Sequence, residues 1–229
     1  MADSYGRILR LIEAIQTLLA EKQEQEGAKM LLRRLRGVEL SEARFRAFDA
    51  QPPPHGADLD QALANIETGG LADVARALKA AKDDLAWAKD DLKYYRPGAD
   101  VGAGYEATNQ HALLIGPGAC GFEEADFSMG IFLLGPRTLY RDHRHLAPET
   151  YINLSPRTGW RFDGGGWSDF PGGSVIFNPP NQVHATRVYD QPFLSVFAWL
   201  NDIDQPCEVV AFDDWPEIEA QLQSIKTKP

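Results

Sequence analysis

Three histidines and one glutamate stand at spacings that suit a metal centre. His143 and His145 are followed by Glu149, and His184 comes after a turn-rich stretch. Imidazole nitrogens and one carboxylate oxygen are ligands that suit zinc, iron or manganese, as well as nickel or cobalt. The chain has only five histidines, and three of them belong to this set. The sequence therefore predicts one divalent transition metal ion as a cofactor, whose identity the ligand types do not fix.

Strand geometry predicts which of these side chains share a face. Residues two apart on a strand point to the same side, so His143 and His145 form one pair while Glu149 and Tyr151 form another. If the turn at Pro148 folds the two segments into a hairpin, all four side chains look into one cavity. Four suitable ligands at these spacings favour a functional metal site over an empty cavity, whereas a single buried histidine is usually a hydrogen-bonded core residue. The remaining histidines, His55 and His111, are interpreted as surface or loop residues.

Composition and charge exclude several classes of protein. The net charge of −10 opposes binding to phosphate backbones, so no nucleic-acid partner is expected. No window approaches 18 consecutive apolar residues, and the N-terminus has no secretory pattern, so a cytoplasmic protein without a membrane span is expected. Cys120 and Cys207 lie far apart in the sequence, and free thiols are the simpler interpretation than a disulfide.

Hydrophobic spacing predicts helices in residues 1–100. Apolar residues recur at helical intervals from Ile8 to Leu19, and three prolines beginning at Pro52 mark a linker or turn. A long amphipathic helix is predicted from Leu71 to Tyr95, ended by the following Pro97. Its apolar stripe can pack on the other helices, on the next domain or on a second copy of the chain. A homodimer is therefore one of the alternatives that the sequence allows.

After about residue 105, short β-rich runs alternate with glycine and proline turns, which favours a barrel or sandwich. The predicted division is an α-helical N-terminal region (1–100), a β-barrel with the metal site (101–212), and a short closing helix and tail (213–229). The fold class is therefore mainly β with a helical N-terminal part. The predicted strands are 127–134, 138–143, 149–154, 159–162, 174–178, 184–188 and 193–200, and the closing helix is 214–225.

The metal-binding pattern resembles the cupin family. Its first motif, His-x-His followed by a short gap and Glu, is matched by His143, His145 and Glu149. Its second motif runs from a glycine through a proline to a histidine. At the spacings of that motif stand Gly173, Pro179 and His184. The resemblance implies a small antiparallel β-barrel, the double-stranded β-helix, with the metal inside.

A narrower resemblance is to the cupin-type dimethylsulfoniopropionate (DMSP) lyases and their relatives. It lies in residues 130–155, in Leu85-Ala86-Trp87 and in Tyr94-Tyr95, and it covers most of the chain after about residue 70. It implies a carbon–sulfur lyase that releases dimethyl sulfide and acrylate from a small zwitterionic carboxylate. The implied metal ligands are His145, Glu149 and His184, with His143 nearby or also ligating. Tyr151 is implied to be the base.

Tyr140 matches a second pocket tyrosine of those lyases. Strict alternation instead places it on the face opposite His143, unless a β-bulge intervenes. We follow the resemblance and predict that Tyr140 is catalytic.

The chemistry of the substrate adds its own expectations. A metal ion would polarise the carboxylate, and a nearby cation would favour the ionised form of Tyr151, whose pKa is otherwise about 10. The sulfonium cation would need an electron-rich aromatic wall. The aromatic residues predicted to bind it are Trp160, Trp167, Phe177 and Trp199.

Two other functions remain open from the sequence. One is a metal-dependent cupin isomerase or oxygenase that acts on another small carboxylate. The other is a non-catalytic cupin binding module. Tyr151 beside Glu149 favours proton abstraction, and hence an enzyme, over the binding module. An oxygenase would require redox-active iron and would consume oxygen, which separates it from a lyase.

Overall fold

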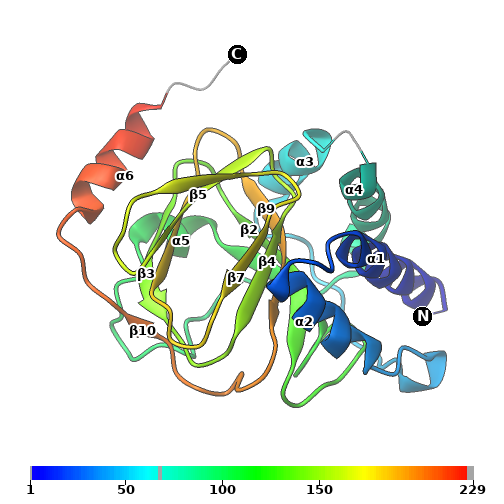
Figure 1. The fold of residues 1–229 in the computed structure, drawn as a ribbon. Coiled ribbons are helices and arrows are strands. Elements are labelled where there is room, and N and C mark those ends of the chain that lie inside the picture. Colours follow the sequence, from blue (N-terminus) through cyan, green and yellow to red (C-terminus); the bar gives the residue numbers. More distant parts are fainter. Residues whose placement is uncertain (1, 67–68, 226–229) are drawn as a thin grey trace.

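The computed structural model describes residues 2–66 and 69–225. Two five-stranded sheets face each other and form a barrel, and helices of the N-terminal part cover one side of it (Figure 1). This arrangement confirms the expected fold class, mainly β with a helical N-terminal part. The strands are β1 (Gln110–Ile115), β2 (Ser128–Leu134), β3 (Leu139–Arg144), β4 (Glu149–Asn153), β5 (Arg157–Phe162), β6 (Ser168–Pro171), β7 (Val175–Asn178), β8 (His184–Arg187), β9 (Phe193–Trp199) and β10 (Glu208–Val209).

The sheets differ in how they are covered. The first has the strand order β1-β2-β9-β4-β7, the second has the order β10-β3-β8-β5-β6, and the strands pair antiparallel in both. Every residue of β2 and β4 is buried. A strand is buried on both faces when helices cover the outside of its sheet, and α2 (Glu26–Arg36) does so by packing on β4 and β7. The first sheet therefore stands between the helices and the interior of the barrel.

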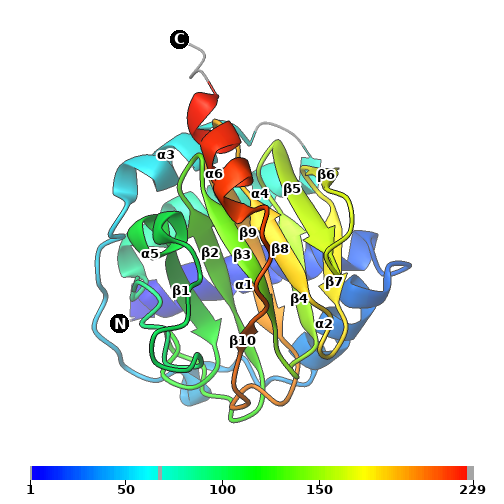
Figure 2. The same cartoon turned by 90° about the vertical axis from the view of Figure 1, so that its left-hand side faces the viewer.

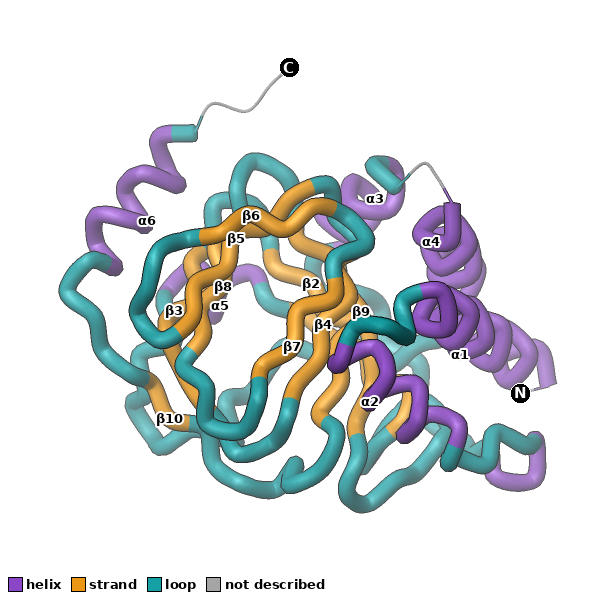
Figure 3. The backbone as a smooth tube through the Cα atoms, in the orientation of Figure 1, coloured by secondary structure: helices purple, strands orange, loops and turns teal. Residues whose placement is uncertain are grey.

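The N-terminal helices lie on one side of the barrel and the C-terminal helix lies on the other (Figure 3). The apolar stripe of α1 faces inward, since Ile8, Leu11 and Ile15 are fully buried in a core shared with the first sheet. This confirms the helical spacing seen in that segment. No helix in the described part of the chain is long and apolar enough to cross a membrane. The helices are α1 (Ala2–Glu21), α2 (Glu26–Arg36), α3 (Gly56–Ala64), α4 (Gly69–Ala81), α5 (Ala103–Thr108) and α6 (Trp215–Ser224), with 3-10 turns η1 (Glu42–Arg44) and η2 (Lys82–Asp84).

The prediction of one long helix over residues 71–95 is wrong. Helix α4 ends at Ala81, and after η2 the chain runs through residues 86–95 without regular structure. Asp90 and Asp91 accept hydrogen bonds from the backbone N–H groups of Leu92 and Lys93, which competes with helical pairing. Leu92 also has a φ of 58°, which an α-helix cannot contain. Trp87 and Tyr95 of this segment are buried, whereas Ala88 is exposed, so its apolar residues do not form one continuous buried stripe.

All seven predicted strands are present, and the closing helix is α6. The sequence reading missed β1, β6 and β10. Strand β6 contains Asp169 and Pro171 and lies at the edge of its sheet, where a weak strand signal is tolerated. Strand β10 has two residues, which are held by pairing with β3 and give no local pattern. Cys120 and Cys207 are both free and buried, which confirms the interpretation as thiols.

Candidate metal centre and active site

Two paired strands, β3 and β8, bring the histidines together. In the pairing of β3 with β8, His143 lies directly opposite His184. His145 follows just after β3, with its Nδ1 held by the carbonyl oxygen of Ala147. The nitrogen ligand atoms of the three histidines all lie within 4.8 Å of one another, and all three residues are buried. These residues form a buried group that can hold a metal ion.

The backbone fixes which nitrogen of each ring faces the cavity. The Nδ1 atoms of His143, His145 and His184 lie 2.8, 2.8 and 2.9 Å from carbonyl oxygens of Arg141, Ala147 and Gln182. A carbonyl oxygen only accepts, so each Nδ1 carries the proton and donates it. Each Nε2 therefore keeps a lone pair that can bind a metal. Metal-binding histidines commonly donate the N–H of their other ring nitrogen to a carbonyl or carboxylate oxygen in this way.

Glu149 completes the cluster from β4. Its Oε2 atom lies 3.4 Å from Nε2 of His145 and 3.3 Å from Nε2 of His184. The carboxylate is held by two donors, Nδ2 of Asn178 to Oε2 at 2.9 Å and Nε1 of Trp199 to Oε1 at 2.7 Å. Burial by itself would raise the pKa of Glu149, but the two adjacent histidines outweigh it and hold that pKa well below its usual value.

These residues fit a divalent metal ion. Burial, followed by the proximity of His184 and His145, keeps the pKa of His143 well below its usual value, so this ring is neutral and can donate a lone pair. Within the described residues, Nε2 of His145 and Nε2 of His184 are buried and have no hydrogen-bond partner. A buried polar atom without a partner is costly, and a metal ion would satisfy both. Imidazole nitrogens beside an ionised carboxylate match the ligand preferences of zinc, iron and manganese.

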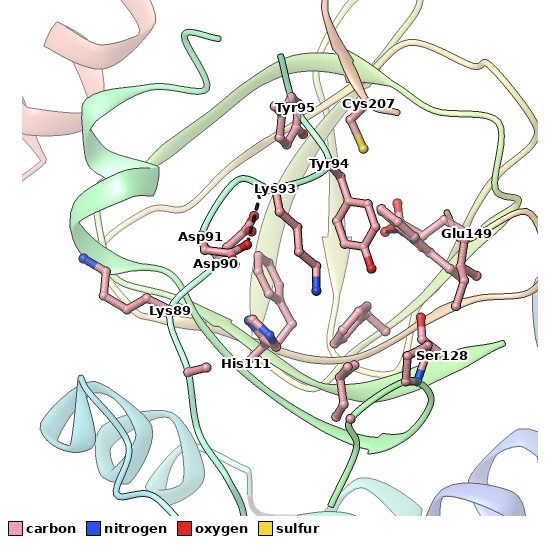
Figure 4. Close-up of a pocket in the computed structure, with 18 of the residues that line it drawn as sticks. Lys89, Asp90, Asp91, Lys93, Tyr94, Tyr95, His111, Ser128, Glu149 and Cys207 are labelled. Carbon is pink, nitrogen blue, oxygen red and sulfur yellow. Dashed lines mark hydrogen bonds between the residues drawn. The ribbon is translucent and has the colours of Figure 1, made fainter. Parts of the chain in front are cut away.

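The cluster opens into a cavity of about 480 Å³, which is within the range of small-molecule sites (Figure 4). Tyr151 lines this cavity and is 5% exposed. Burial, together with the charge of Glu149 and a hydrogen bond to it, raises the pKa of Tyr151 well above 10 when no cation is bound. Tyr151 thus lies beside the carboxylate of the cluster, on the face that the alternation of strand residues predicted.

Tyr140 also lines the cavity, because β3 contains a β-bulge. Tyr140 pairs with Thr186 and His143 pairs with His184, so three steps on β3 match two steps on β8. Strict alternation therefore gives the wrong face, and the bulge is the reason. The ring of Tyr140 stacks on His143 at 4.0 Å, and its hydroxyl lies 2.6 Å from that of Tyr95.

Of the four aromatic residues predicted to bind substrate, Trp199 lines the cavity. Trp160 packs behind Tyr151, with ring centroids 5.0 Å apart, and does not line it. Phe177 pairs with Thr150, which lies between the inward-facing residues of β4, so Phe177 points outward toward Gly27 of α2. The structure therefore does not bring Trp160 and Phe177 to the cavity, and their contact with substrate stays a prediction.

Trp167 does not line the cavity either. Its ring lies outside the barrel beneath the guanidinium groups of Arg161 and Arg187, at 5.0 and 4.6 Å. The loop between β5 and β6 carries it there, and a period-two pattern does not apply to a loop. Spacing alone could not have revealed this position.

Several cavity residues were missed by the sequence reading. The irregular segment 86–95 crosses the cavity mouth and supplies Asp90, Lys93 and Tyr94, which a helix would have placed elsewhere (Figure 4). His111 was predicted to be a surface or loop residue, but it lies on β1 and lines the cavity. His55 lies in the loop before α3, as predicted. The one feature of the sequence that could have indicated a place in the cavity is the pair of aromatic residues at the end of this segment, Tyr94 and Tyr95.

The family profile of dimethylsulfoniopropionate lyase matches residues 27–195. This chain belongs to that family. It is 26% identical over 191 residues to the DMSP lyase DddQ of Ruegeria pomeroyi, a match that covers 83% of this chain and 91% of the relative.

Two solved structures are similar to this chain. The crystal structure of DddQ from Ruegeria pomeroyi has a TM-score of 0.60 and 25% identity, covering 86% of this chain and 96% of that one. A structure from a report on the DMSP lyases RdDddP and RnDddQII has a TM-score of 0.66 and 19% identity, covering 91% of this chain and 100% of that one. The latter likeness concerns the fold alone.

Proposed function

We propose that this chain is a metal-dependent carbon–sulfur lyase that cleaves DMSP into dimethyl sulfide and acrylate. The observation that carries the proposal is that a phenol, Tyr151, lines the same cavity as His143, His145 and Glu149, while His184 converges on these two histidines. Membership of the DMSP lyase family and the likeness to DddQ support the choice of substrate. The site supports elimination because it combines a cation site with a group that can take a proton.

The metal would be held by His143, His145, His184 and Glu149. When bound, a divalent ion polarises the carboxylate of the substrate and favours the ionised form of a neighbouring phenol. The protein supplies the orientation, since the main chain holds each imidazole and Asn178 and Trp199 hold the carboxylate. The choice among zinc, iron and manganese is a matter for measurement.

Tyr151 acts as the base in this proposal. Its oxygen takes a proton from the methylene group beside the substrate carboxylate, and the C–H electron pair becomes the carbon–carbon double bond. The carbon–sulfur bond breaks at the same time, and its electron pair leaves with dimethyl sulfide. Acrylate and one proton remain, so the atoms and charges balance. A positioned general base of this kind contributes about 10²–10⁴-fold to the rate.

Tyr140 is the second catalytic residue of the proposal, as a hydroxyl that binds and orients the substrate. Stacking on His143 fixes its ring, and the hydroxyl contact with Tyr95 fixes its oxygen. A second stack on Tyr105, with centroids 3.9 Å apart, holds the other side of the ring. Tyr140 therefore has little freedom to leave the cavity, which suits a positioning role.

The sulfonium end of the substrate would meet aromatic side chains. The rings of Trp199, Phe132 and Phe197 line the cavity, and their electron-rich faces attract a desolvated cation. Lys93 already places its ammonium group 5.0 Å from the ring centroid of Tyr94 at the mouth of the cavity. Since Lys93 is positive, we place the substrate carboxylate rather than the sulfonium near the polar groups, and the sulfonium among the aromatic residues.

The test is direct. The purified, metal-loaded chain is mixed with DMSP, and dimethyl sulfide in the headspace and acrylate in solution are measured. Tyr151→Phe is expected to remove about 10²–10⁴-fold of the activity while the metal content stays unchanged. Tyr189→Phe, which changes a phenol outside the barrel, is the matched control and should keep its activity. Absence of dimethyl sulfide from the wild-type chain would reject the proposed substrate, and full activity of Tyr151→Phe would reject the base.

A further inference from the structure

The β-bulge in β3 turns two consecutive side chains outward. Tyr140 and His143 face the cavity, so the residues between them, Arg141 and Asp142, lie on the outer side of the barrel. Helix α6 packs against β3 on that side (Figure 2). Both outward side chains contact this helix. The bulge and α6 are therefore one structural unit.

Asp142 makes the more buried of these contacts and is 0% exposed. Its carboxylate accepts a hydrogen bond from Nε1 of Trp215, the first residue of α6, at 2.8 Å. It also accepts two from the guanidinium group of Arg161 on β5, one of them at 2.9 Å. Arg161 in turn pairs with Asp214, just before α6. A buried ion pair whose hydrogen-bonding partners are all present is rigid. It can therefore hold Asp142, and with it the β-bulge, in one conformation.

Arg141 is attached to the same helix. Its guanidinium group donates to both carboxylate oxygens of Glu219, at 3.0 and 3.1 Å, and lies 4.8 Å from the ring centroid of Trp215. It also pairs with Asp100. A bidentate pair fixes orientation as well as distance. Two turns of α6 thus contact both residues of the bulge.

The bulge decides which face Tyr140 and His143 present. Loss of the extra residue from the pairing would shift the register of β3 by one, and a shift of one residue turns a side chain to the other face of the sheet. Tyr140 and His143 could then not both face the cavity. The contacts of Arg141 and Asp142 with α6 therefore affect the direction in which His143 and Tyr140 point, although none of these contacts is part of the candidate metal site.

We propose that α6 is a clamp on the β3 bulge, and that Asp142, Arg161, Trp215 and Glu219 are positioning residues for His143 and Tyr140. This inference rests on the proposed function, because it assigns these residues to the metal site and catalytic pocket of that reaction. The residues that match the family profile end at 195, so α6 lies outside them.

The test compares three variants of the full chain. Trp215→Phe keeps the ring but removes the donor to Asp142, and Glu219→Gln removes the charge that holds Arg141. Leu222→Ala is the control, because Leu222 packs in the same apolar cluster of α6 but its side chain can form no hydrogen bond or ion pair with the bulge residues. For each, Co²⁺ affinity is measured by absorbance titration, Tm by thermal unfolding, and kcat and KM with DMSP. Co²⁺ affinity should fall about 10–100-fold in the first two variants and stay near wild type in Leu222→Ala, even though its Tm falls.

Unchanged Co²⁺ affinity in both Trp215→Phe and Glu219→Gln would overturn the clamp. The clamp would also be overturned if the Co²⁺ affinity fell in parallel with Tm in all three variants. That pattern is expected if α6 only stabilises the fold. A wild-type chain that binds no Co²⁺ would also overturn it. If the wild type binds Co²⁺ but releases no dimethyl sulfide, the proposed function fails, while the comparison of Co²⁺ affinities still decides the clamp.

Discussion

His143 and His184 lie opposite each other across the β3–β8 pairing, with imidazole centroids 4.2 Å apart. Two rings so close, both buried, cannot both carry a charge without strong repulsion, so at least one is neutral. Each ring donates from Nδ1 to a carbonyl oxygen, which leaves Nε2 for a cation. The register of two strands, rather than the sequence distance of about forty residues, therefore builds the candidate metal site.

Removal of one imidazole from this pair should abolish tight metal binding. His184→Ala is expected to lower the affinity for Zn²⁺ or Co²⁺ more than about 100-fold, because changes outside the ligand set alone cost ~10–100-fold. Titration with a competing chelator measures this. His111→Ala is the control, since His111 lines the cavity without belonging to the cluster. Wild-type affinity in His184→Ala would contradict the ligand assignment.

Trp199 has two separable roles, and one substitution distinguishes them. Trp199→Phe keeps an aromatic face but removes the N–H that donates to Oε1 of Glu149 at 2.7 Å. We expect a metal affinity about 10–100-fold lower, with a KM for DMSP that changes little. Trp167→Phe, an indole outside the barrel, should change neither. A raised KM with unchanged metal affinity would mean that the ring, not the hydrogen bond, is what the site needs.

Asp84 should make the stability depend on acid pH. It accepts hydrogen bonds from Arg7 and Ser4 of α1, and chiefly the bond from Arg7 lowers the pKa of this carboxyl below 3.8. The ionised form is therefore favoured in the folded chain. The stabilisation is fully present above the unfolded pKa, near 4, and is lost as the pH falls through the folded pKa.

Asp84→Asn tests this directly. At pH 7 the free energy of unfolding should fall by about 1–2 kcal/mol, and the difference from wild type should shrink below pH 4. Urea unfolding at a series of pH values measures it, with the exposed Asp83→Asn as control. A difference that is constant from pH 7 to pH 3 would show that the ionised carboxylate is not responsible.

Gly130 on β2 has no room for a side chain. A Cβ atom there would lie 2.4 Å from the carbonyl oxygen of Ala112 and 2.9 Å from Cα of Leu113, both backbone atoms of β1. Gly130→Ala should therefore destabilise the chain by about 1–3 kcal/mol, measured by denaturant unfolding. Gly166→Ala is the matched control, since no atom lies within 4 Å of its Cβ position. Equal stability of the two variants would contradict this packing.

The sequence predicted the features of the site that depend on local periodicity. His143 with His145, and Glu149 with Tyr151, share faces because alternation along a strand needs no information from the rest of the chain. The barrel and its seven main strands followed from the same signal. The roles of these residues and the domain boundaries at 100 and 212 stay predictions.

Features set by distant contacts were not predictable in this way. The bulge that turns Tyr140 inward depends on β8 and α6, which lie more than forty residues further along the chain. Residues 86–95 kept a helical spacing, yet pairing with β1 and with Cys207 extends them across the cavity mouth. Trp167 and Phe177 were assigned by residue type alone, and type does not determine which face of a sheet or loop a ring occupies.

The supports of the four proposed ligands differ in kind. Main-chain carbonyl groups hold the three imidazoles, and no substitution of a side chain removes a carbonyl. Side chains, Asn178 and Trp199, hold the carboxylate of Glu149. A substitution at either of these two positions would therefore change how the carboxylate is held, while the main-chain supports of the imidazoles would stay in place.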